Sequence, residues 1–155
     1  VRVINAGVSG DTSAGGLRRV GWLLQTRIDM LVLELGGNDG LRGIDLDDTY
    51  QNLLTIVNQT REAYPEVTVV IAGMQVPPNL GPDYTRAFAD LFPRLSQETG
   101  ATLIPFLLEG VGGDASLNLP DGIHPTEAGH QIVAQTVWEV VGPILTAAVP
   151  QRPPQ

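Results

Sequence analysis

The stretch Asp121-Gly122-Ile123-His124-Pro125 combines residue types that can activate a hydroxyl nucleophile. An acid three residues before a histidine, with a glycine between them for a tight bend, can fold its carboxylate back onto the imidazole. A carboxylate held there fixes the tautomer and orientation of the ring, so that the other ring nitrogen can take a proton from a hydroxyl. The structural alternative is that Asp121 ends a loop and His124 caps a helix that Pro125 opens.

Two other stretches are rich in glycine and small polar residues. Each follows a short apolar run and begins where a strand should end. They are Asn5-Ala6-Gly7-Val8-Ser9-Gly10-Asp11-Thr12 and Leu35-Gly36-Gly37-Asn38-Asp39-Gly40. Taken alone, both stretches fit plain turns equally well, because glycine and asparagine are the residues that turns favour.

Together with the turn that contains His124, these stretches resemble the second, third and fifth sequence blocks of the SGNH (GDSL-type) hydrolases. Residues 9–13, 34–43 and 74–81 are similar to the bacterial group of multifunctional acyl-CoA thioesterases, arylesterases and lysophospholipases. The resemblance runs from residue 1 to about residue 145. The family's first block, a Gly-Asp-Ser that carries the nucleophilic serine, has no match in this sequence.

The resemblance implies a small-molecule ester or thioester substrate, such as an aryl or short-chain ester, an acyl-CoA or a lysophospholipid, and no cofactor. His124 would be the general base and then the general acid, and Asp121 would orient it. Gly10, through its main-chain N–H, and Asn38, through its side-chain amide, would donate to the oxyanion of an acyl-transfer intermediate.

The segment from Gly73 to Pro82 contains three prolines and two glycines and is too long for a simple connector. In the family that the chain resembles, the corresponding loop borders the acyl-binding groove. The apolar surface of that groove would here come from Met74, Val76 and Leu80. Ordinary loop packing explains the same residues equally well.

The missing first block implies that the nucleophilic serine lies upstream of this chain. Ser9 is the least unfavourable substitute within it, but its surroundings are not the Gly-x-Ser-x-Gly elbow, because the second glycine comes one residue early. The resemblance also implies the sheet order 2-1-3-4-5, with the absent first strand between residues 1–5 and residues 30–35. We expect a longer protein or a separate N-terminal chain to supply this βα unit.

The elements that position these residues follow from hydrophobic periodicity. Apolar and β-branched runs predict strands over residues 1–5, 30–35, 67–72 and 101–106. Helical spacing predicts helices over residues 17–24, 45–63, 83–99 and 125–141. We expect a kink or break at Pro93, cover on both faces of the strand over residues 30–35, and a solvated side of the first helix that carries Arg18 and Arg19.

This alternation predicts an α/β fold: a three-layer, flavodoxin-like parallel sheet with helices on both faces, lacking its first βα unit. Ligands bind at the carboxyl ends of the strands in such sheets. Gly10, Asn38, the Met74 loop and His124 all follow predicted strands, so they should converge on one rim.

Length and composition favour one domain over residues 1–148, followed by a disordered Pro-rich tail over residues 149–155. Nine basic and 17 acidic residues give a net charge of −8, which disfavours nucleic acid and anionic membranes as partners. The absence of cysteine excludes disulfides, thiolate metal sites and a cysteine nucleophile. No apolar run reaches the roughly 20 residues that cross a bilayer, so we expect no stable membrane insertion. The resemblance favours a periplasmic or secreted location, although no signal peptide is visible.

We expect no metal, because His130 would point roughly 240° away from His124 on a helix and is interpreted as structural. Two other functions stay open. A non-catalytic binding or interaction domain could keep the groove without a nucleophile. A flavodoxin-like nucleotide binder is disfavoured, because the loop from Gly7 to Gly16 lacks the Gly-Lys-Ser/Thr phosphate signature.

Overall fold

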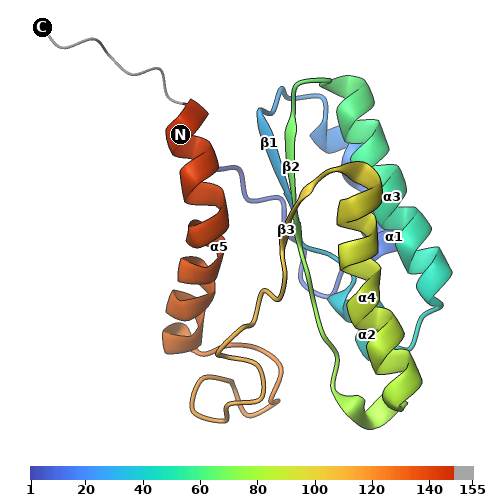
Figure 1. Cartoon of the computed structure of the whole chain (residues 1–155), viewed down its shortest axis with the longest axis vertical. Coiled ribbons are helices and arrows are strands. Elements are labelled where there is room, and N and C mark those ends of the chain that lie inside the picture. Colours follow the sequence, from blue (N-terminus) through green and yellow to red (C-terminus); the bar gives the residue numbers. More distant parts are fainter. Residues whose placement is uncertain (149–155) are drawn as a thin grey trace, which may run out of the picture. The chain divides into compact units, whose positions relative to one another are not determined.

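The computed structural model describes residues 1–148 and divides the chain into two compact units, Val1–Pro105 and Phe106–Gln155. The first unit contains α1 (Ser13–Leu23), β1 (Met30–Leu33), α2 (Gly37–Leu41), α3 (Leu46–Ala63), β2 (Thr68–Ala72), the 3-10 helix η1 (Pro78–Leu80), α4 (Pro82–Thr99) and β3 (Thr102–Ile104) (Figure 1). The second unit contains irregular turns and α5 (Glu127–Ala148). The tail predicted over residues 149–155 lies outside the described residues, and the single domain over residues 1–148 stays a prediction.

The three strands form one parallel sheet in the order β1-β2-β3. Leu33 of β1 lies opposite Ile71 of β2, and Ala72 lies opposite Ile104 of β3. Parallel strands joined by helices confirm the α/β prediction. In the implied order 2-1-3-4-5, β1, β2 and β3 are the third, fourth and fifth strands, and they are neighbours in that order.

The strand predicted over residues 1–5 is wrong. These residues form no strand, and Val1 and Val3 are 93% and 87% exposed. A strand needs a neighbour whose N–H and C=O groups pair with its own. Within residues 1–148, β1 pairs only with β2, and no strand lies along the other edge of β1. Val32 of β1 is 42% exposed, and cover on both faces of this strand stays a prediction.

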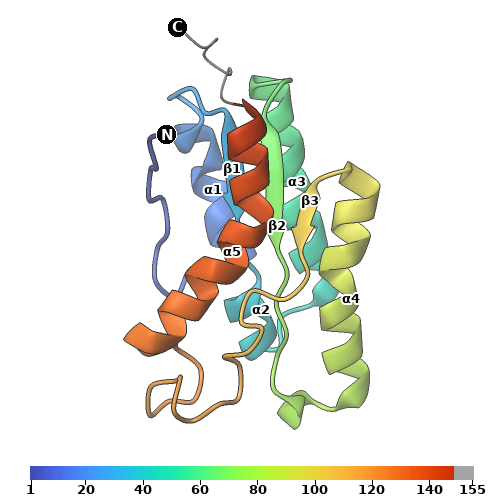
Figure 2. The ribbon, with the colours of Figure 1, turned by 60° about the vertical axis from the view of Figure 1, so that its left-hand side comes forward.

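The main core of the first unit lies between one face of the sheet and the helices α1, α3 and α4, as two views of the ribbon show (Figures 1 and 2). Alternate residues of β2 supply the sheet side, because side chains on a strand point to opposite faces in turn. The core includes Val69, Ile71, Leu53, Ile56, Val57, Phe88, Phe92 and Leu95. The predicted helix layer on the other face stays a prediction.

The helix boundaries have local causes. The Asp45 carboxylate caps α3 by accepting hydrogen bonds from the N–H groups of Asp47 and Asp48. Gly100 ends α4 with a φ of 66°, a left-handed conformation that glycine adopts without strain. The helix α4 continues through Pro93, so no break occurs at that residue. No helix within residues 1–148 has the length and apolar character needed to span a membrane.

Candidate active site

The predicted pair of Asp121 and His124 is formed within the second unit. The Asp121 Oδ2 atom lies 2.8 Å from the His124 Nδ1 atom. The Oδ1 atom accepts hydrogen bonds from the N–H groups of Ile123 at 2.9 Å and of His124 at 3.0 Å. Gly122 has a φ of 71°, so the bend that brings acid and imidazole together uses the freedom of glycine. One carboxylate thus contacts both the main chain and the ring of the same histidine.

The electrostatics of this turn follow from those contacts. The N–H groups of His124 and Ile123, followed by the His124 ring, lower the pKa of Asp121 to about 2. The carboxylate is therefore charged at neutral pH and can hold a proton on Nδ1. Both side chains are open to solvent, with 67% of His124 and 46% of Asp121 exposed. Within the described residues the Nε2 atom has no hydrogen-bond partner, so it is available for a proton transfer.

The helix after this turn begins later than predicted. Pro125 does not open α5 but pairs with Asn118 in an isolated antiparallel bridge. The Thr126 hydroxyl accepts a hydrogen bond from the Gly129 N–H at 3.3 Å, which satisfies one free donor at the start of α5. The Leu119 N–H donates to the His124 carbonyl at 2.7 Å. These contacts fix the backbone on the C-terminal side of the histidine.

Gly10 occupies a tight turn in the first unit. The Asp11 N–H donates to the Val8 carbonyl at 3.1 Å, and Gly10 has a φ of 75° at the third position of this turn. Other residues rarely adopt this conformation, which explains the glycine. Within residues 1–148 the Gly10 N–H donates to no protein group, so it remains available to a ligand.

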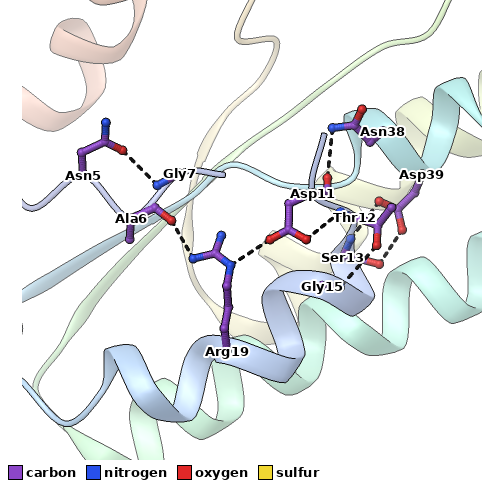
Figure 3. Close-up of polar contacts among 10 residues, drawn as sticks. All are labelled: Asn5, Ala6, Gly7, Asp11, Thr12, Ser13, Gly15, Arg19, Asn38 and Asp39. Carbon is purple, nitrogen blue, oxygen red and sulfur yellow. Dashed lines mark hydrogen bonds and ion pairs between the residues drawn. The ribbon is translucent and has the colours of Figure 1, made fainter. Parts of the chain in front are cut away.

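Asn38 lies beside this turn. Its Nδ2 atom donates to the Asp11 carbonyl at 3.0 Å, as Figure 3 shows. The Arg42 Nη2 atom donates to the Gly10 carbonyl at 3.0 Å. A primary amide carries two N–H groups, so the Asn38 side chain keeps one N–H that can donate to a second acceptor. The two predicted oxyanion donors therefore belong to one connected group of hydrogen bonds.

Arg19 was expected on the solvated side of its helix, but it contacts the same turn. Its Nε atom lies 2.8 Å from the Asp11 Oδ2 atom, and its Nη1 atom donates to the Ala6 carbonyl at 2.6 Å (Figure 3). The side chains of Arg19 and Asp11 are only 27% and 14% exposed. This ion pair ties residues 6–11 to α1, and no spacing rule in the sequence pointed to it.

Asp39 is a further residue that sequence reasoning missed. It is 1% exposed, and its Oδ1 and Oδ2 atoms accept hydrogen bonds from the Ser13 hydroxyl at 2.6 Å and the Ser13 N–H at 2.8 Å. The Thr49 hydroxyl lies 3.4 Å from Oδ1, and the Asn52 Nδ2 atom donates to the Ser13 hydroxyl at 3.0 Å. The only feature of the sequence that pointed to Asp39 was its charge and its position beside Asn38.

The predicted groove residues differ in their surroundings. Val76 is 6% exposed and belongs to the core of the first unit, so it offers almost no surface to a ligand. Met74 is half-buried against that core, and a Cβ built on Gly37 would lie 3.4 Å from its Cε atom. Leu80 is 41% exposed. Met74 thus lies beside the start of α2, and the substrate-binding role of this loop stays a prediction.

The first unit therefore brings Gly10, Asn38 and Met74 into one region, at the ends of β1 and β2. His124 and Asp121 meet in the second unit. Their convergence with the first group stays a prediction. Among residues 1–148, no group of three or more histidine, aspartate or glutamate side chains is arranged to hold a metal ion.

Comparison with known proteins places this arrangement in a family. The sequence model of the GDSL-like lipase/acylhydrolase family matches residues 1–132. Esterase TesA of Pseudomonas aeruginosa is 42% identical over 145 residues, which are 93% of this chain and 71% of that protein. Thioesterase 1/protease 1/lysophospholipase L1 of Escherichia coli K12 is 36% identical over 144 residues, which are 92% of this chain and 68% of that protein.

The fold agrees with the sequence match. A crystal structure of TesA superimposes with a TM-score of 0.87 at 42% identity, and the match covers 92% of this chain and 79% of that one. Two relatives that are 42% and 36% identical to this chain over the aligned residues are thus an esterase and a thioesterase by name. The chain belongs to the GDSL-like lipase/acylhydrolase family, whose members are enzymes that hydrolyse esters.

Proposed function

We propose that this chain supplies the general base, its orienting carboxylate and the oxyanion donors of a serine hydrolase that acts on carboxylic esters and thioesters. The observation that carries the proposal is the Asp121–His124 pair, in which a carboxylate lies 2.8 Å from Nδ1 and Nε2 remains open to a proton donor. That arrangement serves acyl transfer, because the imidazole can take a proton and return it within one cycle.

The proposed cycle begins when Nε2 of His124 takes the proton of a serine hydroxyl and the serine oxygen attacks the carbonyl carbon of the ester. The electron pair of the C=O double bond moves to oxygen, and the N–H groups of Gly10 and Asn38 donate to the resulting oxyanion. The intermediate collapses, and His124 returns the proton to the leaving alcohol or thiol. Water then repeats the sequence on the acyl-serine and releases the acid.

The nucleophile in this proposal is a serine outside these 155 residues. The contacts of the serines within the chain support this assignment. Ser13 is fully buried, and its hydroxyl donates to Asp39. The Ser96 and Ser116 hydroxyls donate to the Ala101 carbonyl and to Asp114. Ser9 is exposed beside Gly10 and is the remaining candidate.

The proposed substrate class rests on the relatives and on the loop after β2. Their names include esterase, thioesterase and lysophospholipase, which have in common an acyl group on oxygen or sulfur. Met74 and Leu80 would contact the acyl chain, because both retain accessible apolar surface. We infer a small-molecule ester or thioester as the substrate.

Hydrolysis of a p-nitrophenyl ester tests the proposal, measured on this chain alone and on an N-terminally extended form that carries the family's first block. We expect turnover by the extended form, its loss in the His124→Ala variant, and no turnover by the chain alone. Ser9→Ala in the extended form should retain activity.

Two results would contradict the proposal. A folded extended form that binds esters without hydrolysing them would favour a binding domain. Turnover by the chain alone that disappears in Ser9→Ala would assign the nucleophile to Ser9 instead. Intact mass and a search for a co-purifying N-terminal peptide establish which form is under study.

A further inference from the structure

Asp39 has contacts that the proposed reaction does not use directly. Its carboxylate is 1% exposed and receives both the N–H and the hydroxyl of Ser13, at 2.8 and 2.6 Å. Burying a carboxylate costs free energy unless hydrogen bonds replace its water. The two residues are 26 positions apart in the sequence, so their contact joins two separate segments of the first unit.

The position of Ser13 explains why a carboxylate is favourable there. Ser13 is the first residue of α1, where N–H groups lack partners within the helix. The helix dipole also favours negative charge at this end. Asp39 therefore fixes the start of α1 against α2, and Figure 3 shows the carboxylate facing this helix end.

Asn38, the neighbour of Asp39, contacts the same segment at a second point. Its Nδ2 atom donates to the Asp11 carbonyl at 3.0 Å. Two consecutive residues of α2 thus hold two nearby main-chain groups, the Asp11 C=O and the Ser13 N–H. One contact alone would allow residues 11–13 to rotate relative to α2, whereas two contacts fix the orientation of these two segments.

The two contacts, at Asp11 and Ser13, lie one and three residues after Gly10. An oxyanion must accept from the Gly10 N–H and the Asn38 amide at the same time, with each donor about 2.7–3.1 Å away. The distance between the two donors therefore decides whether both can act. A displacement of about 1 Å is enough to weaken a catalytic contact strongly.

We propose that Asp39 is a positioning residue that sets the spacing of the two oxyanion donors by anchoring the start of α1 to α2. This inference rests on the proposed function of Gly10 and Asn38. Asp39 contacts no substrate. It acts through Ser13 and through its neighbour Asn38.

The test uses Asp39→Asn and Ser13→Ala in the N-terminally extended form, with the p-nitrophenyl ester as substrate. Asp39→Asn keeps the shape but leaves the Ser13 hydroxyl proton without its acceptor. Ser13→Ala removes the hydroxyl contact to Asp39, together with the acceptor of the Asn52 amide, and retains the Ser13 N–H donor. We expect kcat to fall about 10- to 100-fold in Asp39→Asn and less in Ser13→Ala, with KM within about twofold, because the donors act mainly in the transition state.

The matched control is Asp45→Asn. Asp45 accepts from two main-chain N–H groups at the start of α3, and the substitution removes the same charge without touching residues 10–13. We expect its kcat to equal that of the parent. Unfolding temperatures of all variants separate lost stability from lost turnover. If Asp39→Asn does not fold, Ser13→Ala decides the question alone.

A second measurement does not depend on turnover. The NMR signals of the Asn38 side-chain amide report whether its hydrogen bond to Asp11 persists. In Asp39→Asn we expect faster exchange of these protons with solvent than in the parent. If the parent shows no hydrolysis, the proposed function fails while this measurement still judges the anchoring. A folded Asp39→Asn variant with parental kcat, or with parental amide exchange, would overturn the inference.

Discussion

Asp121 holds His124 at two points, the main-chain N–H at 3.0 Å and the ring Nδ1 at 2.8 Å. Both contacts arise within four consecutive residues, so the orientation of the imidazole is a property of the turn itself. A carboxylate that accepts several hydrogen bonds has a low pKa, because those bonds stabilise its charged form.

The first prediction concerns the titration of Asp121. Its pKa is lowered from 3.8 to about 2, first by the N–H groups of His124 and Ile123 and then by the His124 ring. In His124→Ala the two N–H groups remain, so the pKa should rise but stay below 3.8. A carbon-detected NMR titration of the carboxyl group measures it. A return to 3.8 would show that the imidazole alone causes the shift.

The sign of the pH effect on the turn follows from that shift. Because the folded pKa lies below the unfolded one, Asp121 stabilises the turn fully above about pH 4. This contribution is lost as the pH falls through about 2. Signals of residues 121–124, followed by NMR between pH 6 and pH 2, should report opening of the turn only near the lower limit.

The second prediction concerns the Asp121–His124 pair in the N-terminally extended form. Asp121→Asn should lower kcat, with a loss on the order of 10⁴ as an upper bound, because an amide no longer favours the right tautomer. The exposure of this pair places the expected loss nearer to about tenfold, since water screens the charge. His124→Ala should lose about 10³-fold or more.

His130→Ala is the control for these variants. His130 is exposed on α5 six residues further along, and its loss should leave kcat unchanged. Ester hydrolysis with purified variants measures all three. Equal losses of kcat in His130→Ala and His124→Ala would contradict a specific role of the Asp121–His124 turn in turnover.

The third prediction concerns Asn38. Removal of one oxyanion donor costs about 10²–10³ in kcat in other hydrolases, and we expect a loss of that size in Asn38→Ala with little change in KM. The same substitution at Asn58, which is exposed on α3, serves as the control. A rise in KM with unchanged kcat would instead make Asn38 a binding residue.

The fourth prediction concerns the packing of α2. A Cβ built on Gly40 would lie 2.5 Å from both the Phe88 ring and Val76, so Gly40→Ala forces α2 away from the core. We expect a loss of about 1–3 kcal/mol in the free energy of unfolding. Gly21 of α1 has no atom within 4 Å of such a Cβ. Gly21→Ala should therefore stabilise the protein by about 0.5–1 kcal/mol through helix propensity.

Thermal unfolding of the two glycine variants checks these opposite signs. The comparison holds the chemical change constant and varies only its surroundings. Equal effects of both substitutions would contradict the close packing of α2 against Phe88 and Val76.

Periodic segments were predictable because their signal is local. The helix over residues 45–63 and the strand over residues 67–72 correspond to α3 and β2 within one residue at each end. The strand predicted over residues 1–5 failed for a non-local reason. Its β-branched residues favour extended structure, but a strand also needs a paired neighbour, and propensity carries no information about that neighbour. The short helix α2 was read as a turn, because five residues with two glycines give no helical period.

The sequence by itself determined the Asp121–His124 turn, because a contact over three residues depends mainly on the local chain and on the freedom of Gly122. The resemblance singled out Gly10, and the structure adds a local reason for glycine there, a φ of 75° that most other residues do not adopt. Only the tertiary structure decided that Asp39 binds Ser13, that Arg19 binds Asp11 and that Val76 is buried. The Asp39–Ser13 contact joins residues 26 positions apart, and the packing of the helices on the sheet, rather than any spacing rule, brings them together.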